Sequence, residues 1–285
     1  MTNQNTLCEP DSKILVSVVI PTYDRKILTE AAIDSVVSSE PELIEVIVVD
    51  DCGNEPFVYP WGSNSNEICV HVIRASHNVG PAVARAVGVD SARGSVICFL
   101  DSDDVYSETW IDSVIRTLAQ YSEMQSSGIF IVGGVIGGPL IVRLAKKVIN
   151  FVPDKRKLFV ARVLLMFSNS FCTSGIALSK SACSFNKMRY CEDYYTNAIA
   201  IFRVDRFYQL DTTSCVLSRG QGTRGRVSEA KWKMFKGEMM VKVGILFSDK
   251  LPILYRLLVP FGLCYQIVRD VVLVPARQIK SIVLK

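Results

Sequence analysis

Runs of apolar, β-branched residues recur through the first hundred positions, and they have the pattern of strands buried on both faces of a sheet. We expect strands at residues 13–23, 45–51, 70–75 and 96–104. Apolar residues at helical spacing predict helices at residues 26–39, 81–93 and 108–121, the last with Ser107 as a candidate cap. This order predicts an α/β fold, with a mostly parallel open sheet flanked by helices.

Three of these strands end in polar or acidic residues. The first ends PTYD (21–24), the second VDD (49–51) and the fourth DSDD (101–104). Open α/β sheets bind ligands at the carboxyl ends of their strands, although any one of these endings alone could be a solvated turn. The carboxylates of Asp101, Asp103 and Asp104 repel one another, so the cluster predicts a bound cation.

The second half of the chain gives weaker patterns. Residues 129–142, IFIVGGVIGGPLIV, predict two strands joined by a Gly-rich turn. Residues 218–229 predict a basic loop, in which Arg219, Gln221 and Arg224 are candidates for closing over an anion. Apolar residues then recur every three or four positions and predict one apolar helical face, formed by Trp232, Phe235, Met239, Val243 and Leu246.

Charge divides the chain unequally. Residues 219–285 contain 13 Lys or Arg and 4 Asp or Glu, although the net charge of the whole chain is only +4. We therefore expect a loose N-terminus (1–13), a catalytic domain (14–218) and a basic, amphipathic C-terminal extension (219–285). The extension predicts interfacial helices on an anionic membrane surface. The alternative is a helix packed on the core.

Cysteine usage and the N-terminus bear on the compartment. The chain has nine Cys, an odd number with no C-x-x-C pair, and its first residues form no apolar signal region. We therefore expect a cytoplasmic protein without a disulfide framework, peripherally attached to the inner face of the cell membrane. Two His residues argue against a His-rich zinc site.

Five motifs, in order along the chain, resemble the inverting glycosyltransferases of family 2, which have the GT-A fold. They are SVVIPTYDR (17–25), EVIVVDDCG (45–53), HNVGPAVARAVG (77–88), VICFLDSDDVY (96–106) and CEDYY (191–195). The nearest kind is the bacterial enzyme that extends a lipid-linked, O-antigen-like surface polysaccharide. Asp24 and Ala86 depart from the family pattern, which usually has Asn at both positions.

The resemblance implies transfer of a hexose or N-acetylhexosamine from a UDP-sugar to a glycan hydroxyl, with a lipid-diphosphate-linked intermediate as the acceptor. It implies Mn²⁺ or Mg²⁺ at the D-x-D-D stretch, where Asp103 is the strongest ligand candidate and Asp101 and Asp104 contact the metal, ribose or sugar. Oxygen ligands suit these ions. It implies no nucleic acid partner.

The remaining site residues follow from the same motifs. Binding of the nucleotide falls to the two strand ends, the central helix and the DSDD stretch, and the candidates are Pro21, Thr22, Tyr23, Asp51, Arg85, Asp101 and Ser102. Arg85 could equally be a surface charge on its helix. The match to the family makes Asp193 the general base and Glu192 its supporting residue. Alone, this pair could simply be acidic residues that favour a helix N-terminus.

Two other functions fit a related α/β core. A sugar-phosphate nucleotidyltransferase would release pyrophosphate, and it normally carries a Gly-rich loop after the first strand, which PTYDRK lacks. A non-catalytic nucleotide-sugar-binding protein would not need both the DSDD stretch and the Glu-Asp pair.

Overall fold

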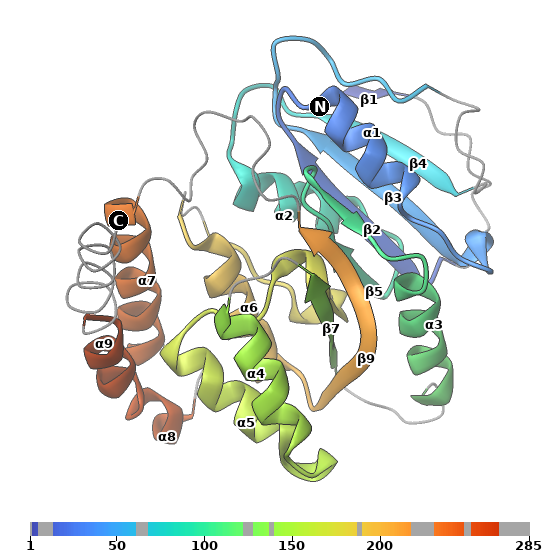
Figure 1. Ribbon diagram of the computed structural model, residues 1–285. Coiled ribbons are helices and arrows are strands. Elements are labelled where there is room, and N and C mark those ends of the chain that lie inside the picture. Colours follow the sequence, from blue (N-terminus) through green and yellow to red (C-terminus); the bar gives the residue numbers. More distant parts are fainter. Residues whose placement is uncertain are drawn as a thin grey trace, which may run out of the picture.

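The computed structural model describes residues 2–4, 14–60, 68–121, 128–136, 140–186, 190–217, 231–247 and 252–267 (Figure 1). The strands are β1 (Thr2–Gln4), β2 (Val16–Thr22), β3 (Ile44–Asp50), β4 (Cys69–Arg74), β5 (Val96–Phe99), β6 (Asp104–Tyr106), β7 (Ile129–Ile136), β8 (Ile176–Ser179) and β9 (Arg206–Leu217). The helices are α1 (Lys26–Asp34), α2 (Pro81–Ser91), α3 (Trp110–Tyr121), α4 (Leu140–Asn150), α5 (Asp154–Phe167), α6 (Glu192–Arg203), α7 (Lys231–Leu246), α8 (Ile253–Arg256) and α9 (Val259–Ile267).

These described strands form one sheet in the order β1-β4-β3-β2-β5-β8-β7-β9-β6. The block β4-β3-β2-β5 is parallel throughout, as the four apolar runs predict. Antiparallel pairs extend the sheet, with β1 beside β4 at one edge and β8 beside β5 on the other side of the block. The expected α/β fold is confirmed, and the antiparallel strands make the sheet mixed.

Alternate residues of the central strands face two different cores. On β2, Val18 and Ile20 belong to the core beneath α1 and α3, whereas Val19 belongs to the core beneath α2. Helix α2 lies very close to the sheet, because a Cβ added at Gly88 would come within 2.4 Å of Cγ1 of Val19. This close packing fixes the side chains that α2 presents at the strand ends.

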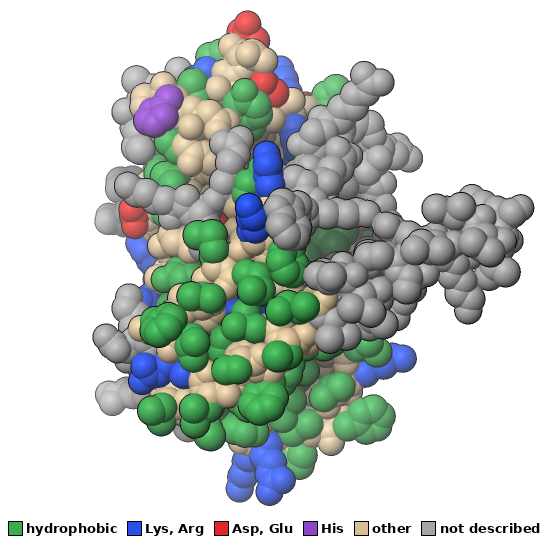
Figure 2. Space-filling model, turned by 90° about the vertical axis from the view of Figure 1, so that its left-hand side faces the viewer, with side chains coloured by type: hydrophobic (Ala, Val, Ile, Leu, Met, Phe, Trp, Pro, Cys, Tyr) green, Lys and Arg blue, Asp and Glu red, His purple; other side chains and the backbone are tan. Residues whose placement is uncertain are grey.

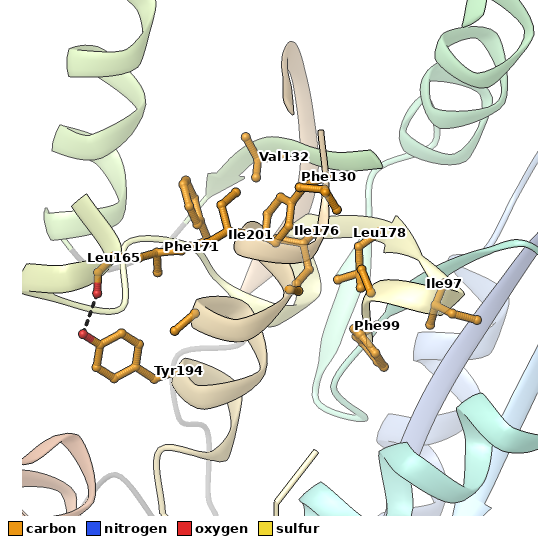
Figure 3. Packing of buried hydrophobic residues seen from close by; sticks show 14 of the residues in the cluster. Ile97, Phe99, Phe130, Val132, Leu165, Phe171, Ile176, Leu178, Tyr194 and Ile201 are labelled. Carbon is orange, nitrogen blue, oxygen red and sulfur yellow. Dashed lines mark hydrogen bonds between the residues drawn. The ribbon is translucent and has the colours of Figure 1, made fainter. Parts of the chain in front are cut away.

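A second region of the core surrounds Phe130 of β7 (Figure 3). The ring of Phe130 lies 5.7 Å from that of Phe171 and 6.0 Å from that of Phe207, centroid to centroid. Ile201 of α6 packs in the same cluster, and the Tyr194 hydroxyl donates a 2.6 Å hydrogen bond to the carbonyl of Leu165. Strand β7, segment 169–175 and helices α5 and α6 are therefore one packed unit.

Residues 129–142 do not form the expected pair of strands. Strand β7 ends at Ile136, and helix α4 begins at Leu140. The prediction was wrong because the Gly-rich stretch was read as a turn between strands. The helical spacing begins only after it, where Ala145 and Ile149 form the buried row of α4.

The helices α7, α8 and α9 pack on the core of the molecule. Val241 and Ile245 of α7 and Val259 of α9 are buried in the same cluster as α5 and α6. The ammonium group of Lys242, on α7, donates a 2.8 Å hydrogen bond to Oε1 of Gln266, on α9. For these helices, the alternative expected for the C-terminal extension, a helix packed on the core, is therefore the one that the structure shows. The predicted apolar face is displaced, because Val243 is exposed.

Three further sequence expectations can be placed. None of the described helices is both long enough and apolar enough to cross a bilayer. Cys69 is disulfide-bonded, which the cysteine count did not lead us to expect, whereas the free thiols include Cys98 and Cys172. The loop candidates Arg219, Gln221 and Arg224 lie outside the described residues, as does most of the N-terminus.

Candidate active site

The strand endings named above meet at one edge of the parallel block. The Asp51 amide, just beyond β3, donates a 2.8 Å hydrogen bond to the carbonyl of Thr22 at the end of β2. The Leu100 amide, just beyond β5, donates to the carbonyl of Val19, one strand away. Parallel pairing therefore places the PTYD, VDD and DSDD endings side by side, as the sequence predicts.

The residues at the end of β2 are partly exposed. The Tyr23 side chain is 46% exposed, whereas Thr22 is buried and its hydroxyl hydrogen-bonds to that of Thr29 at 2.6 Å. Asp24 follows with a φ of 51°, a conformation that Asp and Asn tolerate best after Gly. Its carboxylate accepts hydrogen bonds from the backbone and side-chain amides of Asn54, at 2.6 and 2.8 Å. Asp24 thus joins the two strand endings.

Asp51 fixes the entry to helix α2. Its carboxylate oxygens accept hydrogen bonds from the amides of Val79 and Gly80, at 2.6 and 2.9 Å. Gly80 has a φ of 84°, which suits glycine, and Pro81 then begins the helix. The two amides thus fix the Asp51 carboxylate at the position expected to meet a base N–H.

Arg85 is the centre of the site. It projects from α2, is nearly fully buried and forms ion pairs with Asp101 (Nη2 to Oδ1, 2.6 Å) and Glu192 (Nη1 to Oε1, 3.1 Å). Its Nε is also buried, without a hydrogen-bond partner among the described residues. The alternative of a surface charge is therefore wrong, because one guanidinium joins the DSDD stretch to the Glu-Asp pair.

Burial and charge set the pKa values of this group. Burial by itself would lower the pKa of Arg85, but the nearby carboxylates Asp101, Glu192 and Asp193 outweigh it and raise that pKa above its usual value. Burial raises the pKa of Glu192 and of Asp193, and Arg85 opposes the rise in both. A carboxyl group with a raised pKa is a better proton acceptor, as a general base requires.

The Glu-Asp pair opens helix α6. Cys191 immediately before the helix has a φ of 59°, and Glu192 and Asp193 form the first turn, where the helix dipole favours acidic residues. Oδ2 of Asp193 accepts a 2.8 Å hydrogen bond from Nδ2 of Asn169. Asn197, one turn along α6, donates to Oδ1 of Asn169 at 3.2 Å. Asn169 therefore holds the Asp193 carboxyl and is itself held by Asn197.

The DSDD stretch is held by a second set of partners. Asp103 pairs with Arg25 at 3.2 Å, on the first-strand side of the site. Asp104 is buried at the start of β6 and accepts a 2.7 Å hydrogen bond from the Ser174 hydroxyl, and the same hydroxyl accepts one from the Asp101 amide at 3.1 Å. Ser102 is buried between them in sequence. Asp101 and Asp103 are thus the more accessible carboxylates.

The donor set can be compared with the needs of a divalent cation. Within the described residues, no three or more His, Cys, Asp or Glu side chains converge to hold a metal by themselves. Mg²⁺ in phosphate chemistry is usually held by one or two carboxylates together with substrate phosphates and water. Asp101 and Asp103 supply oxygen ligands of that kind, so the residues fit an ion shared with a bound diphosphate.

The structure brings together Arg85, Asp101, Glu192 and Asp193, all of which the sequence singled out. Sequence reasoning missed the side chains that support them: Arg25, Asn169 and Ser174. Arg25 lies inside a quoted motif and could have been considered. Asn169 and Ser174 lie in FSNSFCTSG, which has no local signal.

The mixed sheet with its flanking helices, and the candidate site at the carboxyl ends of its parallel strands, are those of a GT-A fold. The chain belongs to glycosyl transferase family 2, whose family model matches residues 17–174. The expected family and fold are thereby confirmed.

Curated relatives match the same part of the chain. An uncharacterized glycosyltransferase of Haemophilus influenzae is 33% identical over 106 residues, which are 37% of this chain and 35% of that protein. TuaG of Bacillus subtilis, named as a teichuronic acid biosynthesis glycosyltransferase, is 31% identical over 113 residues, 39% of this chain and 44% of TuaG. The match thus spans less than half the length of either relative.

Solved structures share the fold at low identity. S. aureus TarS in complex with UDP-GlcNAc is similar with a TM-score of 0.65 and 18% identity, over 90% of this chain and 73% of that one. The mannosyltransferase PcManGT from Pyrobaculum calidifontis, in complex with GDP-Man and Mn²⁺, has a TM-score of 0.58 and 17% identity, over 96% and 79% of the two chains.

Proposed function

We propose that this protein transfers a hexose or N-acetylhexosamine from a UDP-sugar to a hydroxyl group of a glycan acceptor, with inversion at the anomeric carbon. The observation that carries the proposal is the pair of bonds from Arg85 to Asp101 and Glu192, because it joins the donor carboxylates to the candidate base. The UDP-GlcNAc complex of TarS supports a UDP-sugar as the donor.

The donor lies along the strand endings in this proposal. The Tyr23 ring packs against the nucleobase, Asp51 accepts a hydrogen bond from a base N–H, and Pro21 and Thr22 shape the turn between them. The exposed Tyr23 ring and the fixed Asp51 carboxylate support these roles. Arg85 and the DSDD stretch, with Ser102 inside it, lie at the ribose and diphosphate.

A divalent cation, Mn²⁺ or Mg²⁺, is proposed at Asp101 and Asp103, and Asp104 supports them through Ser174. When bound, the ion would neutralise charge on the leaving diphosphate as a Lewis acid. We expect chelator to abolish transfer and added Mn²⁺ or Mg²⁺ to restore it. We also expect Asp103→Ala to remove nearly all transfer with little change in unfolding temperature. Full turnover in chelator would refute the metal.

Asp193 is the proposed general base. Its carboxylate takes the proton of the acceptor hydroxyl while the acceptor oxygen bonds to the anomeric carbon and the bond to UDP breaks. A single displacement of this kind inverts the anomeric centre. Asn169 orients the carboxylate, and Glu192 supports it through Arg85. A raised pKa makes Asp193 a stronger proton acceptor than an ordinary aspartate.

The acceptor is proposed to be a glycan on a lipid diphosphate, reached at the cytoplasmic face of the cell membrane. Figure 2 shows hydrophobic side chains gathered on the lower part of one face, with Lys and Arg at its edges. Helices α8 and α9 and the turn between them supply large exposed apolar side chains, among them Leu254, Leu257 and Phe261. Monomeric proteins rarely expose so many together without an interaction to serve.

The proposal assigns residues 14–218 to catalysis and 219–285 to a basic extension that contributes to membrane docking. The structure adds a second basic segment. Residues 140–167, in α4 and α5, contain seven Lys or Arg and one Asp. Helix α5 packs against α8 and α9, so this segment lies next to the exposed apolar helices. Both segments would attract anionic lipid.

The proposal is tested by measuring UDP release from UDP-Glc, UDP-Gal, UDP-GlcNAc and UDP-GalNAc, with and without diphospholipid-linked GalNAc or GlcNAc. Acceptor-dependent release of UDP supports transfer. Release of pyrophosphate would instead indicate a nucleotidyltransferase. Donor binding without any turnover would indicate a nucleotide-sugar-binding protein.

A further inference from the structure

A cavity of about 360 Å³ lies against segment 169–175. Its walls are strand β7, helix α4, strand β9 and the residues around Phe171. The proposed reaction uses none of the side chains that line it. The proposed reaction therefore does not explain why these side chains line a cavity.

The polar part of the wall is cationic. Arg143, Lys146 and Lys147 of α4 line the cavity, and no Asp or Glu is among the described residues that do so. The Lys146 ammonium group donates a 3.2 Å hydrogen bond to the Leu210 carbonyl, which holds it in place. Oε1 of Gln209 is buried there without a hydrogen-bond partner among the described residues. Three cations around one hollow favour an anion.

The rest of the wall is apolar. Val135 and Ile136 of β7, Val142 of α4 and Phe171 face the cavity. Ile136 is also exposed at the surface, so apolar lining continues to the outside. A soluble anion would gain nothing from these side chains. An anion attached to a hydrocarbon chain would be bound by both parts of the wall.

The neighbouring surface of α4 continues this pattern. Leu140, Leu144 and Val148 are exposed and recur every four residues, so they form one row along the helix. The row lies beside Arg143 and Lys147, which follow Leu140 and Leu144 by three positions and so are their neighbours on the helix surface. The cationic side chains thus lie between the cavity and the exposed apolar row. This arrangement suits a lipid whose phosphate is bound at the cavity while the apolar row contacts the bilayer.

The cavity is joined to the active site by one short segment. Phe171, Cys172 and Gly175 line the cavity, whereas Asn169 and Ser174 of the same segment hold Asp193 and Asp104. A ligand that fills the cavity therefore packs against the segment that positions the proposed base.

We propose that this cavity binds the phosphate and the adjoining hydrocarbon of an anionic lipid, and so anchors the lipid-linked acceptor. This inference rests on the proposed transferase function. It assigns Arg143, Lys146 and Lys147 to the phosphate and the β7 side chains to the hydrocarbon. Anchoring here fixes the acceptor beside the segment that carries Asn169 and Ser174.

The test is isothermal titration of the whole protein with farnesyl monophosphate below its aggregation concentration, in parallel with farnesol and inorganic phosphate. We expect farnesyl monophosphate to bind at least about tenfold more tightly than either, since a charge-assisted hydrogen bond and apolar burial each add to affinity. The double variant Arg143→Ala/Lys147→Ala should weaken that binding by at least about tenfold. The control Lys155→Ala/Arg156→Ala, which removes two exposed charges of α5 outside the cavity, should change it less than about twofold.

Three results would overturn the inference: equal binding by the cavity variant and the wild type, binding of inorganic phosphate as tight as that of farnesyl monophosphate, or equal loss in the α5 control. Unfolding temperatures identify any variant that fails to fold, and Val142→Ala/Ile136→Ser then replaces it, with the same loss expected. Titration of wild-type protein with UDP reports the donor site separately. If the wild type does not bind UDP, the proposed transferase function is contradicted. If the cavity variant binds farnesyl monophosphate like the wild type, only the proposal that the cavity binds lipid is contradicted.

Discussion

Arg85 illustrates how one buried charge can organise a site. Its guanidinium contacts Asp101 beyond β5 and Glu192 at the start of α6, two positions 91 residues apart in the chain. Without that cation, carboxyl groups from both segments would be enclosed together and would repel one another. A bound donor adds negative charge at the same place. The arginine is therefore suited both to assembling the site and to receiving a diphosphate.

Asp193→Asn is the sharpest single substitution at the active site. The amide keeps the size of the side chain but cannot accept the acceptor proton, so kcat should fall by roughly 10²-fold or more. Binding of UDP should change little, because Asp193 makes no proposed contact with the nucleotide. Steady-state kinetics and UDP titration separate the two effects. Asp154→Asn, exposed on α5, is the matched control. Wild-type turnover by Asp193→Asn would show that another residue is the base.

Glu45 predicts how stability depends on pH. Burial would raise its pKa, but hydrogen bonds from His71, Ser17 and Arg93 outweigh burial and lower the pKa from 4.5 to about 2. The folded state therefore binds the proton more weakly than the unfolded state. The resulting stabilisation, about 3 kcal/mol at about 1.4 kcal/mol per pKa unit, is complete above about pH 5 and is lost as pH falls towards 2.

Glu45→Gln should accordingly lower the free energy of unfolding at pH 7 by about 2–3 kcal/mol and much less at pH 3. Denaturant unfolding at both pH values measures this difference. The exposed Glu42→Gln is the control, with little change at either pH. A loss of equal size at pH 3 and pH 7 would mean that the carboxylate charge is not the source of the stability.

Among the elements, the regular parallel block was the easiest to predict. Its strands are continuous β-branched runs, and helices α1 and α2, which separate β2 from β3 and β4 from β5, favour parallel pairing. The antiparallel additions were not predictable, because β6 has only three residues and β8 four, too few for a periodic signal. The Gly-rich stretch before α4 was taken for a turn between two strands, whereas a helix follows it.

The candidate site was predicted to a similar extent. Carboxylates at strand ends can be recognised from the sequence, and so can an acidic pair at the start of a helix. Asn169 and Ser174 do not, because their role depends on how segment 169–175 crosses between β5 and α6. The contact of Arg85 with Glu192 depends in the same way on tertiary packing. Long-range partners of this kind carry no local pattern.

Removal of the C-terminal helices should destabilise the whole protein. Val241, Ile245 and Val259 are buried in the main core, and losing even one large core side chain typically costs about 2–5 kcal/mol. Truncation after residue 230 should therefore yield protein that unfolds at a much lower temperature or aggregates. Leu254→Ser, at an exposed position of α8, should leave the unfolding temperature nearly unchanged. A truncated chain as stable as the full one would show that these helices are not part of the core.

On the scale of the whole molecule, the candidate active site and the surface proposed for membrane contact lie on different parts of one packed body. The strand endings carry the donor carboxylates, whereas α4, α5, α8 and α9 gather on the side of the molecule away from β4 (Figure 1). The described part of the chain has no helix able to cross a bilayer. The exposed apolar side chains of α8 and α9 and the basic segments support the proposed contact with a membrane surface.

Surface attachment predicts salt-dependent binding to anionic vesicles. Basic residues near an anionic surface contribute about 1 kcal/mol each, and salt screens this attraction. We expect co-sedimentation at low salt and partial release at high salt. Leu257→Asp/Phe261→Asp should weaken binding at both salt concentrations, because it places charge on the exposed apolar surface of α9 and of the turn before it. Ile27→Asp, at an exposed apolar position of α1, should bind like the wild type. No binding at low salt, or equal loss in both variants, would contradict the proposed surface.

The central claim is that one site, organised by Arg85, transfers a glycosyl group from a UDP-sugar with inversion. NMR of the products formed from an α-linked UDP-sugar and a diphospholipid-linked acceptor tests it directly, with Asp193→Asn as the comparison. The account predicts free UDP and a β-linked product with the wild type, and about 10²-fold less of both with Asp193→Asn. Pyrophosphate in place of UDP, an α-linked product, or equal yields from the two proteins would contradict it.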